Sequence, residues 1–459
     1  MSMGRRQPLQ QTDLWVPTAE LPRSPGHAFY DRLNSLLAEA GFDRHVEDLC
    51  LPHYTDGIGR ESVPPGIYFR MLLVGYFEGL DSQRAIAWRC ADSLSLRTFL
   101  GIPLHEATPD HSSLTRIRQR LPVDVHDKVF VFVLEIAHDK KLLRGKTVAV
   151  DSTTLEANAA MKAIIRRDTE EDWKEYLKRL LAEQGVTNPT DEEIRRFDKG
   201  RKGKKVSNKN WTSPADPDSR IARMKDGTTH LAYKAEHAVD LDSEFVLAAT
   251  VHPADQSDPA TLVNSIVTAQ INLVLAGSEQ EIEEAVADKA YHKAQTLADC
   301  ARLNTRTYIP EPKRRNKRNW QDKPAEWERA TAENRRRTKR GKSKRLQKKR
   351  SELVERSFAH VCETGGGRRT WLRGLADVSK RYAVQVAAHN LGLLMRKLFG
   401  VGKPRALQGA AGLFVVMVCW LHWLSNLLGR SKGGEHPRTG QPLSSDGWIH
   451  PTTHCSTVC

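Results

Sequence analysis

The sequence predicts an α/β protein: a mixed five-stranded sheet with helices, preceded by an all-α N-terminal domain. Over 29–140, apolar residues recur every three or four positions, which is the period of helices packed by one face. The period changes at 147–151, where a short β-branched run indicates a strand, and four more strand patterns follow by residue 310. A chain of 459 residues is too long for one compact core, so two or three units are expected.

The N-terminal part is predicted to be an arm followed by a helical bundle. Residues 1–28 carry basic side chains without the apolar stretch of a secretory signal, and are expected to be disordered or extended. The apolar spacing in 67–80 gives one helix, and 82–101 followed by 109–122 resembles a helix-turn-helix pair. Either Ser112 or Ser113 is expected to cap the last helix.

The region 141–400 is predicted to hold the sheet. Its first strand precedes a polar insertion at 160–225, which carries a charged helix and a Lys-rich stretch. After this insertion we expect a hairpin of strands 230–240 and 244–255, followed by a helix at 259–275. Two more strands are expected next, one that ends at Asp288 and one at 306–310, and then a helix from about 343 to 361.

Two carboxylates follow strands that are expected to be neighbours. Asp151 comes after the first strand, and Asp288 after the fourth. In a mixed sheet with the hairpin on one side, both acids would reach the same edge, and two like charges that close require a cation. Taken singly, Asp151 is more typical of a turn cap and Asp288 of a helix N-cap.

A third acid is expected from the last helix of this region. Glu352 and Glu355 lie three residues apart on one face, so either could point at the site, and we favour Glu355. Alone, Glu355 reads as a solvated helix residue beside Arg356. Three carboxylates suit Mg²⁺ or Mn²⁺, and a site with two such ions would support phosphodiester transfer.

Positive charge is concentrated between the second and third acids. The net charge is +15, and the segment 313–350 contains 18 Lys or Arg against four acidic residues, which indicates a polyanionic partner. We expect a phosphate-contacting arm in which Trp320 and Trp327 stack on bases or fill the core; a solvated loop is the alternative. The expected DNA contacts are Lys313, Arg314, Arg315, Lys317, Arg318, Arg350 and Arg356.

Several of these motifs resemble one protein family. The stretches YFRMLLVGYFEGLDSQRAIAWRCADSLSLRTFLGI, VAVDSTTLEANAA, LAYKAEHAVD, VADKAYH and SELVERSFAHV are similar to those of bacterial insertion-sequence DDE transposases of the IS-four and IS-five type. The resemblance extends over about 45–397 and implies a helical N-terminal transposase domain, for DNA binding or assembly, and a ribonuclease-H-like catalytic core. The family's signature also carries a Tyr and an Arg shortly before the Glu and a Lys seven residues after it. Here Ser351 stands four residues before Glu355, with Arg350 one place off, and Cys362 stands where the Lys would be.

The resemblance implies a function. The chain is expected to bind terminal inverted repeats, cut DNA with two Mg²⁺ or Mn²⁺ ions held by Asp151, Asp288 and Glu355, and join the ends to target DNA as a dimer or higher oligomer. A nuclease of the same fold without strand joining, and a degenerate copy that only binds DNA, are the alternatives. The implied location is the bacterial cytoplasm, associated with the nucleoid.

The remaining features concern compartment and tail. Seven scattered cysteines without zinc spacing fit a reducing compartment. The region 401–459 is expected to form an apolar helix and a disordered tail. Its uncharged stretch 409–428 is long enough to span a bilayer, but the polar residues in its second half favour a buried helix over a membrane span.

Overall fold

The computed structural model describes residues 15, 17, 27–55, 59, 61–201, 206–224, 227–313 and 318–404. Nearly all of the arm expected at 1–28, and all of the tail from 405 onward, lie outside the described residues. The apolar stretch 409–428 is among them, so its expected helix is not tested. Within the described ranges, no helix is long and apolar enough to cross a membrane.

The N-terminal region is helical, as its apolar spacing predicts. Asp110 caps α6, because its Oδ1 accepts a hydrogen bond from the Ser113 backbone N at 2.8 Å. The prediction that Ser112 or Ser113 is the cap was wrong: the carboxylate one turn earlier takes that place. The helices are α1 (His27–Glu39), α2 (Phe42–Cys50), α3 (Pro65–Glu78), α4 (Gln83–Ala91), α5 (Leu94–Leu100), α6 (His111–Arg120) and α7 (Val123–Asp139).

The sheet is mixed and has six strands in the described chain. β1 pairs antiparallel with β5 and parallel with β7, and β7 pairs parallel with β8. All five expected strands are present, and the sixth comes from the insertion, where β4 pairs with the start of β5. The strand order in the sheet is β4-β5-β1-β7-β8, and β6 also pairs with β5. The strands are β1 (Thr147–Glu156), β4 (Arg220–Arg223), β5 (Thr229–Asp240), β6 (Val246–Pro253), β7 (Glu284–Val286) and β8 (Arg306–Tyr308).

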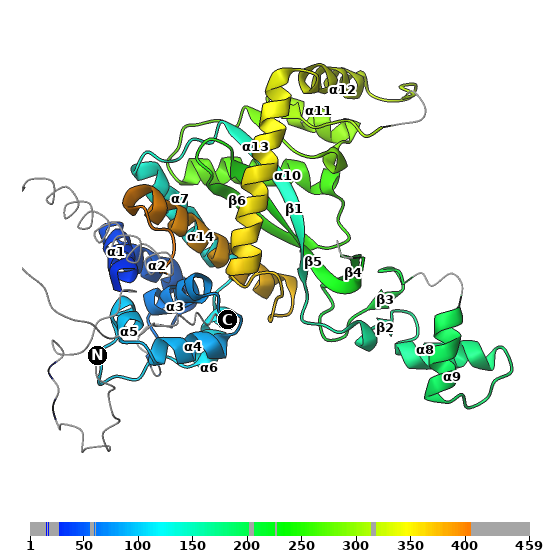
Figure 1. Ribbon diagram of the computed structural model, residues 1–459, viewed down its shortest axis with the longest axis horizontal. Coiled ribbons are helices and arrows are strands. Elements are labelled where there is room, and N and C mark those ends of the chain that lie inside the picture. Colours follow the sequence, from blue (N-terminus) through cyan, green and yellow to red (C-terminus); the bar gives the residue numbers. More distant parts are fainter. Residues whose placement is uncertain are drawn as a thin grey trace, which may run out of the picture. The chain divides into compact units, whose positions relative to one another are not determined.

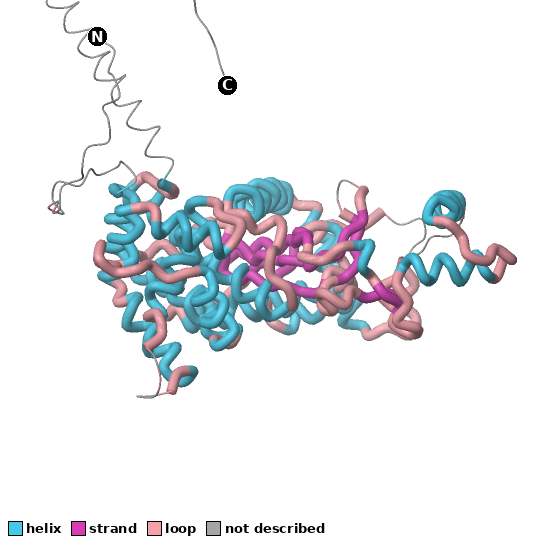
Figure 2. The backbone as a smooth tube through the Cα atoms, turned by 90° about the horizontal axis from the view of Figure 1, so that it is seen from below, coloured by secondary structure: helices cyan, strands magenta, loops and turns pink. Residues whose placement is uncertain are grey.

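Helices cover both faces of this sheet (Figures 1 and 2). On one face, His237 of β5 hydrogen-bonds Ser357 and Tyr382, at 2.8 Å each. On the other face, Lys234 of β5 reaches Asp258 at 2.8 Å, because alternate residues of a strand point to opposite sides. The helices that come after β6 in the chain are α10 (Asp258–Leu275), α11 (Ala294–Arg302), α12 (Ala325–Thr338), α13 (Gly341–Phe358) and α14 (Leu375–Phe399).

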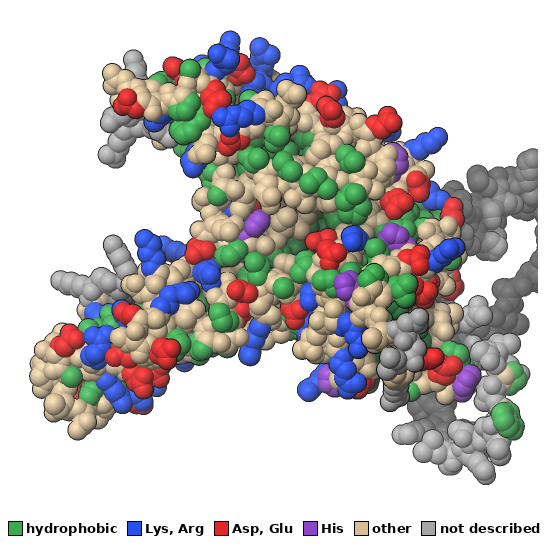
Figure 3. All heavy atoms as spheres, turned by 180° about the vertical axis from the view of Figure 1, so that it is seen from behind, with side chains coloured by type: hydrophobic (Ala, Val, Ile, Leu, Met, Phe, Trp, Pro, Cys, Tyr) green, Lys and Arg blue, Asp and Glu red, His purple; other side chains and the backbone are tan. Residues whose placement is uncertain are grey.

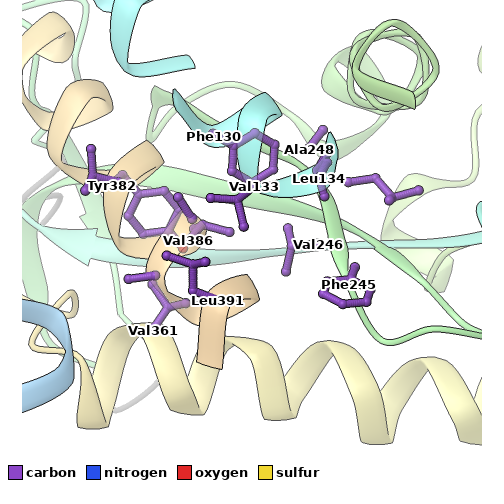
Figure 4. Close-up of a cluster of buried hydrophobic side chains, with 14 of the residues drawn as sticks. Phe130, Val133, Leu134, Phe245, Val246, Ala248, Val361, Tyr382, Val386 and Leu391 are labelled. Atoms are coloured by element: carbon purple, nitrogen blue, oxygen red, sulfur yellow. The ribbon is translucent and has the colours of Figure 1, made fainter. Parts of the chain in front are cut away.

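One continuous cluster of buried apolar side chains joins the helical region to the sheet. Figure 4 shows its centre, where α7, α14 and β6 contribute Phe130, Tyr382 and Val246, among others. Asn390 of α14 is fully buried there, and its side-chain amide bonds both the N–H and the C=O of Val246. The core therefore fixes α14 against β6 through polar as well as apolar contacts.

The insertion forms a small module beside the sheet. α8 (Trp173–Ala182) and α9 (Asp191–Gly200) each begin with a capping box and pack through Leu177, Leu181 and Ile194. The short strands β2 (Ile165–Arg166) and β3 (Trp211–Thr212) pair at its base. Figures 1 and 2 both show α8 and α9 standing apart from the main body.

The described part of the basic segment is largely helical. It forms α12 and most of α13, so the alternative of a solvated loop does not apply to 325–350. Trp327 is partly buried against the core, whereas Trp320 carries Arg318 and Lys323 over its ring. Figure 3, the face opposite to that of Figure 1, shows Lys and Arg side chains gathered at the α12 end.

Candidate active site

Asp151 lies in the middle of β1, because this strand continues to Glu156 along its antiparallel partner β5. The parallel neighbour β7 is much shorter and pairs only with Thr147–Ala149. Asp151 therefore stands just beyond the carboxyl end of β7, where the sheet is open on that side. In mixed and parallel sheets, this edge is where binding groups collect.

Asp288 follows β7 at this same edge. Its Oδ1 accepts a hydrogen bond from the Ala290 backbone N at 2.7 Å and so caps the 3₁₀ turn Lys289–Tyr291. The N-cap alternative is thus confirmed, and it is compatible with a role at the site. The expectation that β1 and β7 are neighbours is also confirmed, and the charge of Asp288 is close enough to act on Asp151.

Arg350 of α13 supplies the positive charge at Asp151. Its guanidinium lies 2.5 Å from Asp151 Oδ2, and both side chains are mostly buried, at 13% and 26% exposure. Burial raises the pKa of Asp151; the guanidinium opposes this shift, and the neighbouring charge of Asp288 adds to it. Arg350 thus supplies a positive charge beside Asp151, where the negative charge of Asp288 also acts.

Helix α13 crosses the sheet with two distinct flanks. The side facing the sheet carries Arg350 and Gln347, whose amide donates to the carbonyls of Ala287 and Tyr308 at 3.0 and 2.7 Å. One flank is held by acids at the amino end of β1 and β7. These ion pairs are Lys342 with Glu284, Lys349 with Asp242, and Arg356 with Glu244.

The two candidate glutamates are neighbours on the exposed side of α13. Glu352 pairs with Arg356, toward the flank held at the amino end of β1. Glu355 accepts a hydrogen bond from Ser351 Oγ at 2.9 Å. Of the two, Glu355 is closer to the side of the helix on which Gln347 reaches Ala287, which follows β7.

The described residues contain no ready-made group of three or more His, Cys, Asp or Glu side chains that could hold a metal ion. The donors that the structure does bring together are the carboxylates of Asp151 and Asp288, and oxygen donors of this kind fit Mg²⁺ or Mn²⁺. The Arg350 guanidinium already stands where a cation is favourable. Glu355 is not grouped with these two acids; its carboxylate accepts a hydrogen bond from Ser351 Oγ on the same helix.

Most described members of the expected DNA contacts are engaged within the protein. Arg318 is nearly buried, pairing with Glu311 at 3.0 Å and stacking on Trp320. Arg350 and Arg356 hold the ion pairs given above, and Lys313 is exposed. Arg314, Arg315 and Lys317 lie outside the described residues.

Sequence reasoning missed a buried polar cluster on the opposite face of β1 and β5. Glu236 pairs across the sheet with Ser152, is 1% exposed, and its carboxyl oxygens lack a well-formed hydrogen bond among the described residues. Burial raises the pKa of Glu236 to about 7, while Thr261 and Lys234 act against this shift. The alternation of charged residues in KAEH, within a predicted strand, could have indicated this cluster from the sequence.

Tyr291 connects this cluster to the site. It belongs to the turn capped by Asp288, is fully buried, and lies close enough to Glu236 and Asp151 for both charges to raise its pKa. The Asp288 turn thus lies near both β1, which carries Asp151, and β5, which carries Glu236.

Comparisons with known proteins match two regions of the chain. A model described as a transposase domain (DUF772) matches residues 19–120, and a model described as a transposase DDE domain matches residues 279–395. The second match includes Asp288 and Glu355. No curated protein and no solved structure matches the chain significantly. The match to a transposase domain in the helical N-terminal region and the match to a transposase DDE domain in the α/β core together support an insertion-sequence DDE transposase.

Proposed function

We propose that this transposase binds the terminal inverted repeats of its element, cleaves the DNA in a metal-dependent reaction, and transfers the 3′ ends to target DNA. The observation that carries the proposal is that Asp151 of β1 and Asp288, which follows the parallel neighbour β7, lie close enough for the charge of one to act on the other. The matched transposase domains support DNA as the substrate and a nucleotidyl-transfer or endonuclease type of enzyme.

In this proposal, Asp151, Asp288 and Glu355 would hold one or two divalent ions, Mg²⁺ or Mn²⁺. Ions bound there would activate the attacking water or 3′ hydroxyl and neutralise the leaving oxygen. The fit rests on the carboxylate donors and on the cation position now taken by Arg350.

The protein's own groups would position the DNA. Arg350 would move from Asp151 to a phosphate oxygen of the substrate, since a guanidinium binds phosphate as readily as carboxylate. In the first step, water adds to phosphorus and the P–O3′ bond breaks, which frees a 3′ hydroxyl. In the second, that hydroxyl adds to a target phosphodiester and displaces the target's own 3′ oxygen.

The assignment of regions follows the same proposal. The helices of 29–140 would recognise the repeats or assemble subunits, 141–400 would form the catalytic domain, and a dimer or higher oligomer would hold two ends. A cytoplasmic, nucleoid-associated location is the corresponding prediction.

Asp151→Asn tests the proposal. We expect Mg²⁺-dependent cleavage of an element-end duplex to fall at least 10³-fold, on the order of ~4 kcal/mol of barrier, with binding of the duplex retained. Undiminished cleavage would remove Asp151 from the site. Supplying a pre-cut end with a free 3′ hydroxyl separates a transposase from a nuclease, because only a transposase joins that end to target DNA.

A further inference from the structure

The flank of α13 that carries Glu355 also carries two lysines. Lys344, Lys348, Ser351 and Glu355 are spaced by four, three and four residues, so they form one stripe along the helix. Lys344 and Lys348 are exposed, and neither forms an ion pair with any described residue. The opposite flank differs, because acids from the sheet neutralise Lys342, Lys349 and Arg356.

This difference leaves uncompensated positive charge on the exposed side of α13. The stripe adjoins the side of the helix on which Gln347 reaches the carbonyls of Ala287 and Tyr308, at the carboxyl ends of β7 and β8. Exposed cations continue beyond the start of α13 at Arg336, Lys339 and Arg340. A polyanion placed along the stripe would gain from each lysine without breaking an existing ion pair.

We propose that Lys344 and Lys348 form a phosphate track that leads one DNA strand to Glu355. The inference rests on the proposed function and adds the direction of the substrate. At 1.5 Å per helical residue, the two lysines are separated by about 6 Å and Lys348 precedes Glu355 by about 10 Å. With one phosphate per 3.4 Å of axis in each strand, Lys348 contacts the backbone about three nucleotides from the phosphate that reacts.

The chain offers a matched control on the same helix. Lys344→Ala/Lys348→Ala and Arg345→Ala/Lys349→Ala each remove two positive charges four residues apart, from exposed positions of α13. Only the first pair lies on the stripe with Glu355. Because all four side chains are on the surface, both double variants are expected to unfold at the wild-type temperature.

The test measures binding of a fluorescein-labelled duplex of mixed sequence by anisotropy, in EDTA and over a range of salt. Two lost phosphate contacts should reduce the slope of log K against log salt by about 1.8, and weaken binding roughly 10- to 100-fold at low salt. The control pair should change the slope by less than half of this. Equal slopes for the two double variants would overturn the track.

Cleavage kinetics distinguish this proposal from the proposed function. Loss of the track should raise KM and leave kcat within a few-fold of wild type, because the lysines lie away from the reacting phosphate, whereas Glu355→Gln should lower kcat. If Glu355→Gln loses kcat but the two double variants behave alike, the proposed function stands and the track is wrong. If the wild-type protein binds no duplex, both proposals fail.

Discussion

Replacing Arg350 with alanine removes the cation that faces Asp151. The pair is mostly buried, at 13% and 26% side-chain exposure, and closes at 2.5 Å. Its loss leaves Asp151 beside Asp288 without compensation. A cost between those of exposed and fully buried pairs, about 2 to 3 kcal/mol, is expected. With an unfolding entropy of about 2.1 cal/mol/K per residue, this lowers Tm by about 3 °C.

Divalent ions should restore the stability that Arg350→Ala loses, because a bound ion and the guanidinium would both neutralise the Asp151 carboxylate. In thermal unfolding followed by circular dichroism, Mg²⁺ should raise Tm more for Arg350→Ala than for wild type, and at lower Mg²⁺ concentration. Arg345→Ala, an exposed change on the same helix, is the control and should behave as wild type. If Arg350→Ala has the wild-type Tm in EDTA and the same Mg²⁺ response, the cation role of Arg350 is wrong.

Two further substitutions test the interior. Because burial raises the pKa of Glu236 from 4.5 to about 7, the folded chain binds more protons than the unfolded chain between these values, so this group's contribution to stability is lost as pH rises through that window. The free energy of unfolding of Glu236→Gln, measured with urea, should therefore rise relative to that of wild type by up to about 3 kcal/mol as the pH is raised from 4 to 8. If the difference between the two proteins is the same at every pH, Glu236 does not have the raised pKa of a buried carboxyl. Asn390→Ala leaves both backbone groups of Val246 without partners and should cost about 2 to 4 kcal/mol in the same assay at pH 8, whereas an unchanged urea midpoint would show that water replaces the amide.

The sheet could be predicted because its strands have a clear period and a fixed order. Once β1 and β7 are taken as parallel neighbours, the approach of Asp151 and Asp288 follows from topology alone. The extent of β1 could not be read in the same way. Its second half, STTLE, is polar, and it becomes a strand only because β5 runs alongside it to Ala232.

The orientation of α13 could not be predicted, because it depends on contacts between residues far apart in the chain. Helical spacing alone left Glu352 and Glu355 equivalent. The ion pairs of Lys349 with Asp242 and of Arg356 with Glu244 turn one flank toward the amino end of β1, which puts Glu352 nearer to that flank than Glu355.

The basic segment illustrates a second limit of sequence reasoning, since composition does not show which cations remain available. Arg318 belongs to a run of positive charge, yet it is nearly buried against Glu311 and Trp320. Lys344 and Lys348 were not among the expected contacts, yet both are exposed and lie on the same helix as Glu355. Whether a Lys or Arg side chain remains available for a polyanion depends on which acidic residues lie next to its helix in the folded chain.

The claim that Asp151 binds the catalytic metal directly is tested most sharply by Asp151→Cys. A thiolate is a softer ligand than a carboxylate and suits Mg²⁺ less than Mn²⁺. Cleavage of an element-end duplex should be lost in Mg²⁺ and partly recovered in Mn²⁺, measured against wild type in each metal. Full activity in Mg²⁺, or an equal loss in both metals, would contradict direct ligation by Asp151.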